Sequence, residues 1–213
     1  MTGVPDHPES LMPAPLRLDP QRSAVLSMDC QTAIVSIYAK GQEAFLANAA
    51  RVLAEARAAG ILVIHVKVGF RPNLPEVSAR NMLLSAVKDS PQHQKLFEGA
   101  AGEIHPSLAP EGDEAVIIKH RVSAFTGTDL DMILRANEID RLVLFGIATS
   151  GVVLSTLLHA ADSDYRLAVI KDCCADLDQD VHACLIDKIF PRQATVLSAT
   201  EFAEVLKSVR RPS

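Results

Sequence analysis

The sequence contains no tryptophan, has aromatic residues at only 4% of its positions and shows no run of lysine or arginine. Proteins that bind nucleic acid usually present a basic patch, stacking aromatic side chains or both. This chain instead carries a formal net charge of -5. We therefore expect a small-molecule substrate and no nucleic-acid partner.

Metal-binding spacings are also missing. The 4 cysteines and 7 histidines form no C-x-x-C, H-x-H or H-E-x-x-H pattern, and such patterns are what bring two ligands to one ion. We predict no metal site and no cofactor. In a cytosolic protein the default role of such cysteines is that of small buried apolar residues, so structural disulfides are not expected.

A secretory signal is not visible either, because MTGVPDHPES lacks a basic start and an apolar segment. This predicts a cytosolic protein. Residues 142–161 carry no formal charge and are long enough to cross a bilayer. Glycines and hydroxylated residues interrupt this stretch, with β-branched residues before the first glycine and helix formers after it. We interpret it as a buried strand followed by a helix, with no membrane span.

Apolar runs and helical patterns alternate after a proline-rich tail at residues 1–21. The predicted strands are 23–28, 61–66, 114–119, 141–145, 167–171 and 194–197. The predicted helices are 43–59, 79–87, 128–136, 151–162, 180–189 and 201–209, and the third of these opens on what resembles a capping box at Thr128 to Asp131. Continuous apolar strands followed by helices indicate a parallel sheet covered on both faces. We predict one three-layer α/β/α domain over residues 22–213.

Polar residues stand at the carboxyl ends of three predicted strands, which is where parallel sheets bind ligands. Asp29 follows the first strand, Lys119 ends the third, and a small-residue turn at 146–152 follows the fourth. Each has an ordinary structural explanation: a turn residue, a solvated lysine and a tight corner. Their coincidence at one edge of the sheet favours a functional site.

Four segments contain or follow these residues: AVLSMDCQ, AVIIKHRVSAF, GIATSGVVLSTLLHAADSDYRLAVIKDCCAD and VHACLIDKIFPRQATVLSATEF. They resemble the isochorismatase-like hydrolase superfamily, also called the cysteine hydrolases, over nearly everything from residue 22 to the end. The resemblance implies a six-stranded parallel sheet in Rossmann-like order, a homo-oligomer (dimer or tetramer) and an Asp-Lys-Cys triad. Asp29 and Lys119 match the first two members of that triad, and the nucleophile's place falls on Val152.

The turn at 146–152 has two further implied features. Its backbone at Ala148, Thr149, Gly151 and Val152 is expected to bind a developing oxyanion. The resemblance also suggests a cis peptide bond between Ala148 and Thr149.

Valine has no atom that can attack a carbonyl, so Val152 excludes the covalent cysteine route at that position. Cys30, Cys173 or Cys174 could replace the nucleophile, although we interpret all three as structural residues. The superfamily also contains isochorismatases without the cysteine, which protonate a vinyl ether through the strand-one aspartate and then use water. Asp29 would then exchange the proton, Lys119 would be the nearby cation, and Arg71 or Arg80 would bind an acidic substrate unless both are merely exposed loop charges.

Two functions follow from these residues. The first is a hydrolase of a small, acidic metabolite that works without a covalent cysteine intermediate. The alternative is a catalytically degenerate family member that binds a metabolite or a protein partner. Both require Asp29 and Lys119 to face one cavity beside the 146–152 turn.

Overall fold

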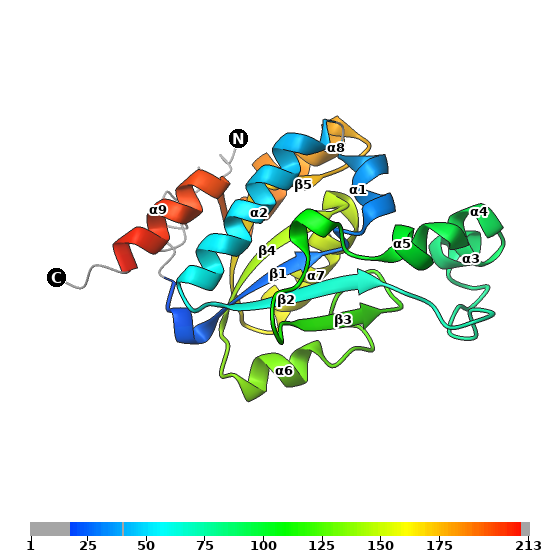
Figure 1. Ribbon diagram of the computed structural model, residues 1–213, viewed down its shortest axis with the longest axis horizontal. Coiled ribbons are helices and arrows are strands. Elements are labelled where there is room, and N and C mark those ends of the chain that lie inside the picture. The colour runs from blue at the N-terminus through cyan, green and yellow to red at the C-terminus, as the bar shows by residue number, and fades with distance from the viewer. Residues whose placement is uncertain (1–17, 40, 210–213) are drawn as a thin grey trace, which may run out of the picture.

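The computed structural model describes residues 18–39 and 41–209, and its centre is a parallel six-stranded sheet in the order β3-β2-β1-β4-β5-β6. The strands are β1 Ser23–Met28, β2 Leu62–Val68, β3 Ala115–Lys119, β4 Arg141–Ile147, β5 Arg166–Ala175 and β6 Ala194–Leu197. Helices flank the sheet (Figure 1). The predicted α/β fold and its six strands are therefore confirmed.

The helices are α1 Thr32–Tyr38, α2 Gln42–Ala58, α3 Met82–Lys88, α4 Pro91–Gln94, α5 Gly99–Gly102, α6 Leu130–Ala136, α7 Leu154–Asp162, α8 Gln179–Cys184 and α9 Ala199–Val209. Helices α2 and α9 pack together on one face of the sheet, while α6 and α7 lie on the other (Figure 1). Helices α1, α4 and α5 were not predicted, because each is short and has no long apolar periodicity.

The position of each strand in the sheet determines how it is buried. Every residue of the central strand β1 is buried. Edge strand β3 instead alternates, with Val116 and Ile118 exposed and Ile117 and Lys119 buried. Coverage on both faces, as predicted from the apolar run, is therefore wrong at this edge strand. The alternation directs Lys119 inward, toward the carboxyl end of the sheet.

Between β2 and β3 the chain makes a long excursion that carries α3, α4 and α5 beyond the carboxyl ends of these strands (Figure 1). It has a small apolar cluster of its own, formed by Leu74, Val77 and Leu84 with Phe70 and Val87 packed against them. Because this cluster is separate from the main core, the excursion is a distinct wall above the edge of the sheet that binds ligands in parallel folds.

Several helices begin a few residues from their predicted starts, as α3 at Met82 and α9 at Ala199 do, and two of these differences bear on the site. Helix α6 begins at Leu130, and its N-cap residue Asp129 makes no side-chain cap hydrogen bond; the Thr128 hydroxyl accepts from the Leu130 N–H instead. The predicted capping box is therefore wrong. After β4, residues 149–153 form an irregular turn with Gly151 outside helical dihedral angles, so the regular helix α7 begins only at Leu154.

The stretch at 142–161 that lacks formal charge consists of most of β4, this turn and most of α7. Among the described residues, no helix combines the length and the apolarity needed to cross a bilayer. The predicted tail lies mostly outside the described residues; within its last part, residues 20–22 form a single 3-10 turn.

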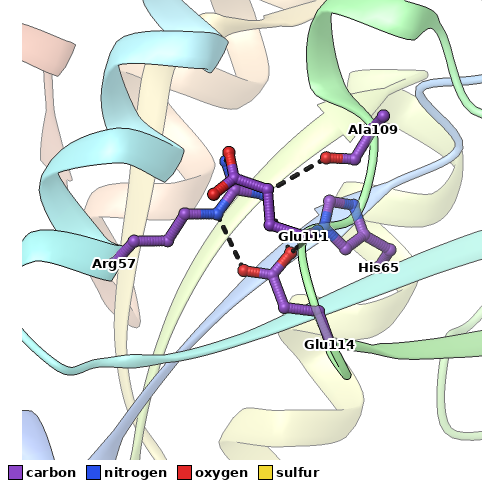
Figure 2. Close-up of polar contacts among 5 residues, drawn as sticks. All are labelled: Arg57, His65, Ala109, Glu111 and Glu114. Atoms are coloured by element: carbon purple, nitrogen blue, oxygen red, sulfur yellow. Dashed lines mark hydrogen bonds and ion pairs between the residues drawn. The ribbon is translucent and has the colours of Figure 1, made fainter.

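A partly buried ion pair joins α2 to the start of β3, as Figure 2 shows. Arg57 Nε and Nη2 each donate to one oxygen of Glu114 at 2.8 Å, and the Glu111 N–H (2.9 Å) and His65 Nε2 (3.1 Å) add contacts to the second oxygen. Burial opposes the charge on Glu114, but these hydrogen bonds outweigh it and lower the pKa of Glu114 to about 2. Both oxygens of this carboxylate are fully engaged.

Candidate active site

Asp29 and Lys119 meet at the carboxyl edge of the sheet. Asp29 follows β1 in a left-handed conformation with φ of 53°, and its N–H donates to the Val66 carbonyl at 2.8 Å. Lys119 ends β3, and its Nζ lies 2.8 Å from Asp29 Oδ2 and 3.0 Å from the carbonyl oxygen of Arg121. Since β2 separates β1 from β3, the two side chains join across the end of that strand.

Both side chains of this pair are buried, and one of the two oxygens of Asp29 has no hydrogen-bond partner among the described residues. Asp29 is 6% exposed and Lys119 is 2% exposed. Oδ1 of Asp29 is buried and accepts no hydrogen bond from any described residue. Burial raises the pKa of Asp29 above its ordinary value, and the neighbouring Lys119 offsets part of that rise. The result is a carboxyl group with one oxygen paired to Lys119 and the other buried without a hydrogen-bond partner.

Gly146 brings the next strand close to this pair. A Cβ atom at position 146 would lie 2.0 Å from the carbonyl oxygen of Met28, so only glycine fits there. The cis peptide bond joins Ile147 to Ala148. The predicted bond between Ala148 and Thr149 is therefore wrong by one residue, because a resemblance locates a loop without giving the dihedral angles of its residues.

Asp176 and His182, which both follow β5, form hydrogen bonds to the turn at 149–150. Both the N–H and the hydroxyl of Ser150 donate to Asp176 Oδ2 at 2.7 Å. The Thr149 hydroxyl forms a 2.8 Å hydrogen bond with His182 Nδ1. Neither Thr149 nor Ser150 lines the cavity next to Asp29, so neither hydroxyl is placed to act as a nucleophile there.

A cavity of about 420 Å³ lies above the Asp29-Lys119 pair. Ala148, Gly151 and Val152 form one of its walls, whereas Thr149, the fourth predicted turn residue, is turned away toward His182. Most of the remaining wall is apolar and comes from α1 and the β2-β3 excursion. Among its members are Ile34, Ile37, Tyr38, Phe70, Leu83, Leu84, Val87, Leu96 and Phe97.

The arginine in this cavity is not one of the two that were predicted. Arg71 and Arg80 are both exposed and do not line it; Arg71 reaches His120 Nε2 at 3.2 Å and borders two neighbouring hollows. Arg121 lines the cavity instead. Its signal in the sequence was its position two residues after Lys119, in the loop that leaves the carboxyl end of β3.

The three candidate replacement thiols are buried, and none lines the cavity. Burial raises the pKa of Cys30 and of Cys174 to about 12, and it raises the pKa of Cys173 as well. Because the thiolate is the nucleophilic form, these environments disfavour the reactive state. The geometry supports a structural role for all three.

Within the described ranges, no group of three or more histidine, cysteine or acidic side chains is arranged to hold a metal ion. The polar groups at the cavity are a carboxyl, an ammonium and a guanidinium group, the imidazoles of His93 and His120, the Tyr38 hydroxyl and a backbone turn. These groups can exchange protons and bind negative charge.

A buried Asp-Lys pair beside a glycine turn, at the carboxyl edge of this sheet, is the arrangement expected of an isochorismatase-like hydrolase. The model of the isochorismatase domain matches residues 23–201. The chain belongs to the isochorismatase family, and it is a hydrolase of that family.

Individual relatives agree with this assignment. The chain is 28% identical to maleamate amidohydrolase of Pseudomonas putida over 80% of this chain and 78% of that protein. It is 30% identical to the isochorismatase family protein YwoC of Bacillus subtilis, over 90% and 98% of the two chains. An isochorismatase family structure from Burkholderia thailandensis has a TM-score of 0.77 at 28% identity, covering 90% of this chain and 98% of that one.

Proposed function

We propose that this protein hydrolyses a small, acidic metabolite with Asp29, Lys119 and water, without a covalent cysteine intermediate. The observation that carries the proposal is Asp29, which lines the same cavity as Val152 and whose buried Oδ1 has no hydrogen-bond partner among the described residues. The position matched to the family's nucleophile thus has no reactive atom, while the matched acid keeps an oxygen without a partner.

The chemistry balances with these groups alone. Asp29 in its acid form donates a proton to the substrate as the scissile bond breaks, and a water oxygen forms the new bond to the electrophilic carbon. That water returns a proton to the Asp29 carboxylate. Lys119 stabilises the carboxylate between these steps, and the rise in the pKa of Asp29 on burial favours the acid form from which the cycle starts.

The alternative is a non-catalytic member of the family that binds a metabolite or a protein partner. Val152 favours it, because a chain with valine at the position matched to the nucleophile need not carry out the reaction. The two functions differ in one measurable property, since only the hydrolase releases product.

A substrate screen across vinyl ethers, amides and esters tests the proposal. Amides are included because one relative is named for hydrolysing maleamate. For any compound that is turned over, we expect Asp29→Asn to lower the rate by about a hundredfold to ten-thousandfold, the loss typical of a missing general acid or base.

The matched control is Asp131→Asn, because Asp131 is on α6, pairs with Arg135 at 2.8 Å and lies in an exposed ion pair. This variant should retain the wild-type rate. Equal rates for Asp29→Asn and the wild type would show that Asp29 is not the acid. Tight binding of the screened compounds without product would favour the alternative.

Three further predictions accompany the proposal: a cytosolic location, a homo-oligomer (dimer or tetramer), and a domain that spans residues 22–213. The native mass in solution, measured by light scattering, tests the second of these. A monomeric mass would contradict it.

A further inference from the structure

The charges around the cavity do not reflect those of the whole chain. The formal net charge of the protein is -5. Among the described residues that line the cavity, Lys119 and Arg121 are the lysine and the arginine, His93 and His120 are the histidines, and Asp29 is the acidic residue. When Asp29 is ionised, its pair with Lys119 is formally neutral and Arg121 leaves one positive charge in excess; when Asp29 is protonated, the charge of Lys119 adds to that excess.

Backbone carbonyls hold Arg121 in place. Its Nη1 donates to the His120 oxygen at 2.6 Å, and its Nη2 donates to the Glu76 oxygen at 2.9 Å. Among the described residues no carboxylate forms an ion pair with Arg121, in contrast to Lys119. A guanidinium has five N–H donors, so donors remain after these two contacts. A fixed guanidinium loses less entropy when it binds an anion.

We infer that Arg121 binds the negative group of the substrate, and that the substrate class is a monoanionic carboxylate with an apolar body. The inference rests on the proposed function in treating the bound molecule as a substrate. The binding itself does not depend on turnover. Arg121 supplies one positive charge, which matches one carboxylate. The apolar walls from α1 and the β2-β3 excursion match an uncharged body, because burying a second charge there would lack a partner.

Phenylacetate and its neutral amide, phenylacetamide, are suitable probes because they share an apolar body and differ in charge. Titration calorimetry with the full chain should show that the wild type binds phenylacetate at least about tenfold more tightly, as expected for charge-assisted hydrogen bonds. In Arg121→Gln the two affinities should become nearly equal. Arg135→Gln, which changes an exposed arginine on α6, should keep the wild-type preference.

Two additional measurements keep the test decisive. Arg121→Lys retains the charge but not the planar fork, so it should show an intermediate preference even if the glutamine variant does not fold. Raising the ionic strength should weaken the binding of phenylacetate to the wild type and leave that of phenylacetamide unchanged. A wild type without preference for the anion, or an Arg121→Lys variant and an Arg121→Gln variant that both keep the full preference, would overturn the inference.

The outcome is separable from that of the proposed function. Asp29→Asn should lose turnover and keep or strengthen the preference for phenylacetate, because Lys119 loses its counter-charge. If Arg121 proves to control anion binding but no compound is hydrolysed, the inference stands and the proposed reaction fails. If a substrate is hydrolysed and Arg121→Gln does not alter anion preference, the reaction stands and the inference fails.

Discussion

Strand β3 separates two ion pairs that use the same chemistry in opposite ways. Just before the strand, Glu114 engages both of its oxygens with Arg57, and Glu111 and His65 add contacts to one of them (Figure 2). At the end of the strand, Lys119 engages one oxygen of Asp29 and the other has no partner among the described residues. The first carboxylate is saturated with donors, and the second is not.

This difference separates an ion pair whose carboxylate is fully paired from one whose carboxylate keeps an oxygen without a partner. A buried polar atom without a partner costs about 1 to 3 kcal/mol, and Asp29 Oδ1 is one of five such side-chain atoms among the described residues, with Ser23 Oγ, Ser27 Oγ, His65 Nδ1 and Glu76 Oε2. Asp29 is the one of these five residues that lines the cavity. The two pKa shifts also have opposite signs: the pKa of Glu114 falls to about 2, and that of Asp29 rises. The four hydrogen bonds to Glu114 stabilise its charged form. Burial of Asp29 with fewer hydrogen bonds favours its protonated form.

Removal of Lys119 should give the largest change in stability. Lys119→Met leaves Asp29 buried without a counter-charge, so we expect the free energy of unfolding to fall by about 4 kcal/mol at pH 8 in urea titrations. Because Asp29 has a raised pKa in the folded state, the folded protein binds a proton that the unfolded chain releases. Stability of the variant should therefore recover as the pH falls through that raised pKa.

Lys67→Met is the matched control, since Lys67 lies on β2 and pairs with Glu103, whose side chain is 67% exposed. We expect it to cost less than about 1 kcal/mol, with little dependence on pH. An equal loss in the two lysine variants would show that the Asp29-Lys119 pair is an ordinary ion pair, and the contrast with Glu114 would disappear.

Glu114→Gln should give a smaller loss with a different pH window. We expect about 2 kcal/mol at pH 7, because Arg57 loses one of its two charged partners but is itself partly solvated. A carboxyl whose pKa is lowered stabilises the fold above its ordinary value of 4.5, and this contribution is lost as the pH falls toward 2. The gap between wild type and variant should therefore close only in that acidic range.

Glu111→Gln is the matched control for Glu114→Gln. Glu111→Gln removes a carboxylate that also contacts Arg57 but is 70% exposed, so the loss should be below about 1 kcal/mol. Turnover by the folded Glu114→Gln protein should match the wild type. A pH-independent gap between wild type and Glu114→Gln would contradict the assigned pKa shift.

The sequence predicted one of these regions and not the other. Asp29 and Lys119 could be found because each stands at the end of an apolar run, and parallel strands bring such ends together. Arg57, His65 and Glu114 have no comparable signal. They are ordinary charged or polar residues on a helix, within a strand and in a loop, and only the packing of α2 against the sheet brings them into contact.

The errors within the site have a similar origin. Arg71 and Arg80 were chosen because they lie in the segment after β2, but the path of that excursion leaves both exposed. Arg121 was passed over although it follows Lys119 by two residues. A strand pattern can predict which side of the chain a residue occupies, but the course of a long irregular loop depends on contacts that the pattern does not contain.

The smallest expected effect is that of thiol reagents on activity, and it tests whether the open carboxyl is sufficient. Cys30 directly follows Asp29, yet its thiol is buried and donates weakly to the Met28 carbonyl, and its pKa is raised to about 12. Iodoacetamide should modify the exposed Cys184 first and leave turnover within about twofold of the untreated enzyme, because thiolate formation limits the reaction at the buried sites. Mass spectrometry of the treated sample identifies the modified residues.

If modification of Cys30, Cys173 or Cys174 abolishes turnover while the matching Cys→Ser variant stays active, the reagent has blocked the cavity and the mechanism stands. If that folded Cys→Ser variant is inactive as well, a relocated thiol performs the chemistry, and Asp29 with water does not.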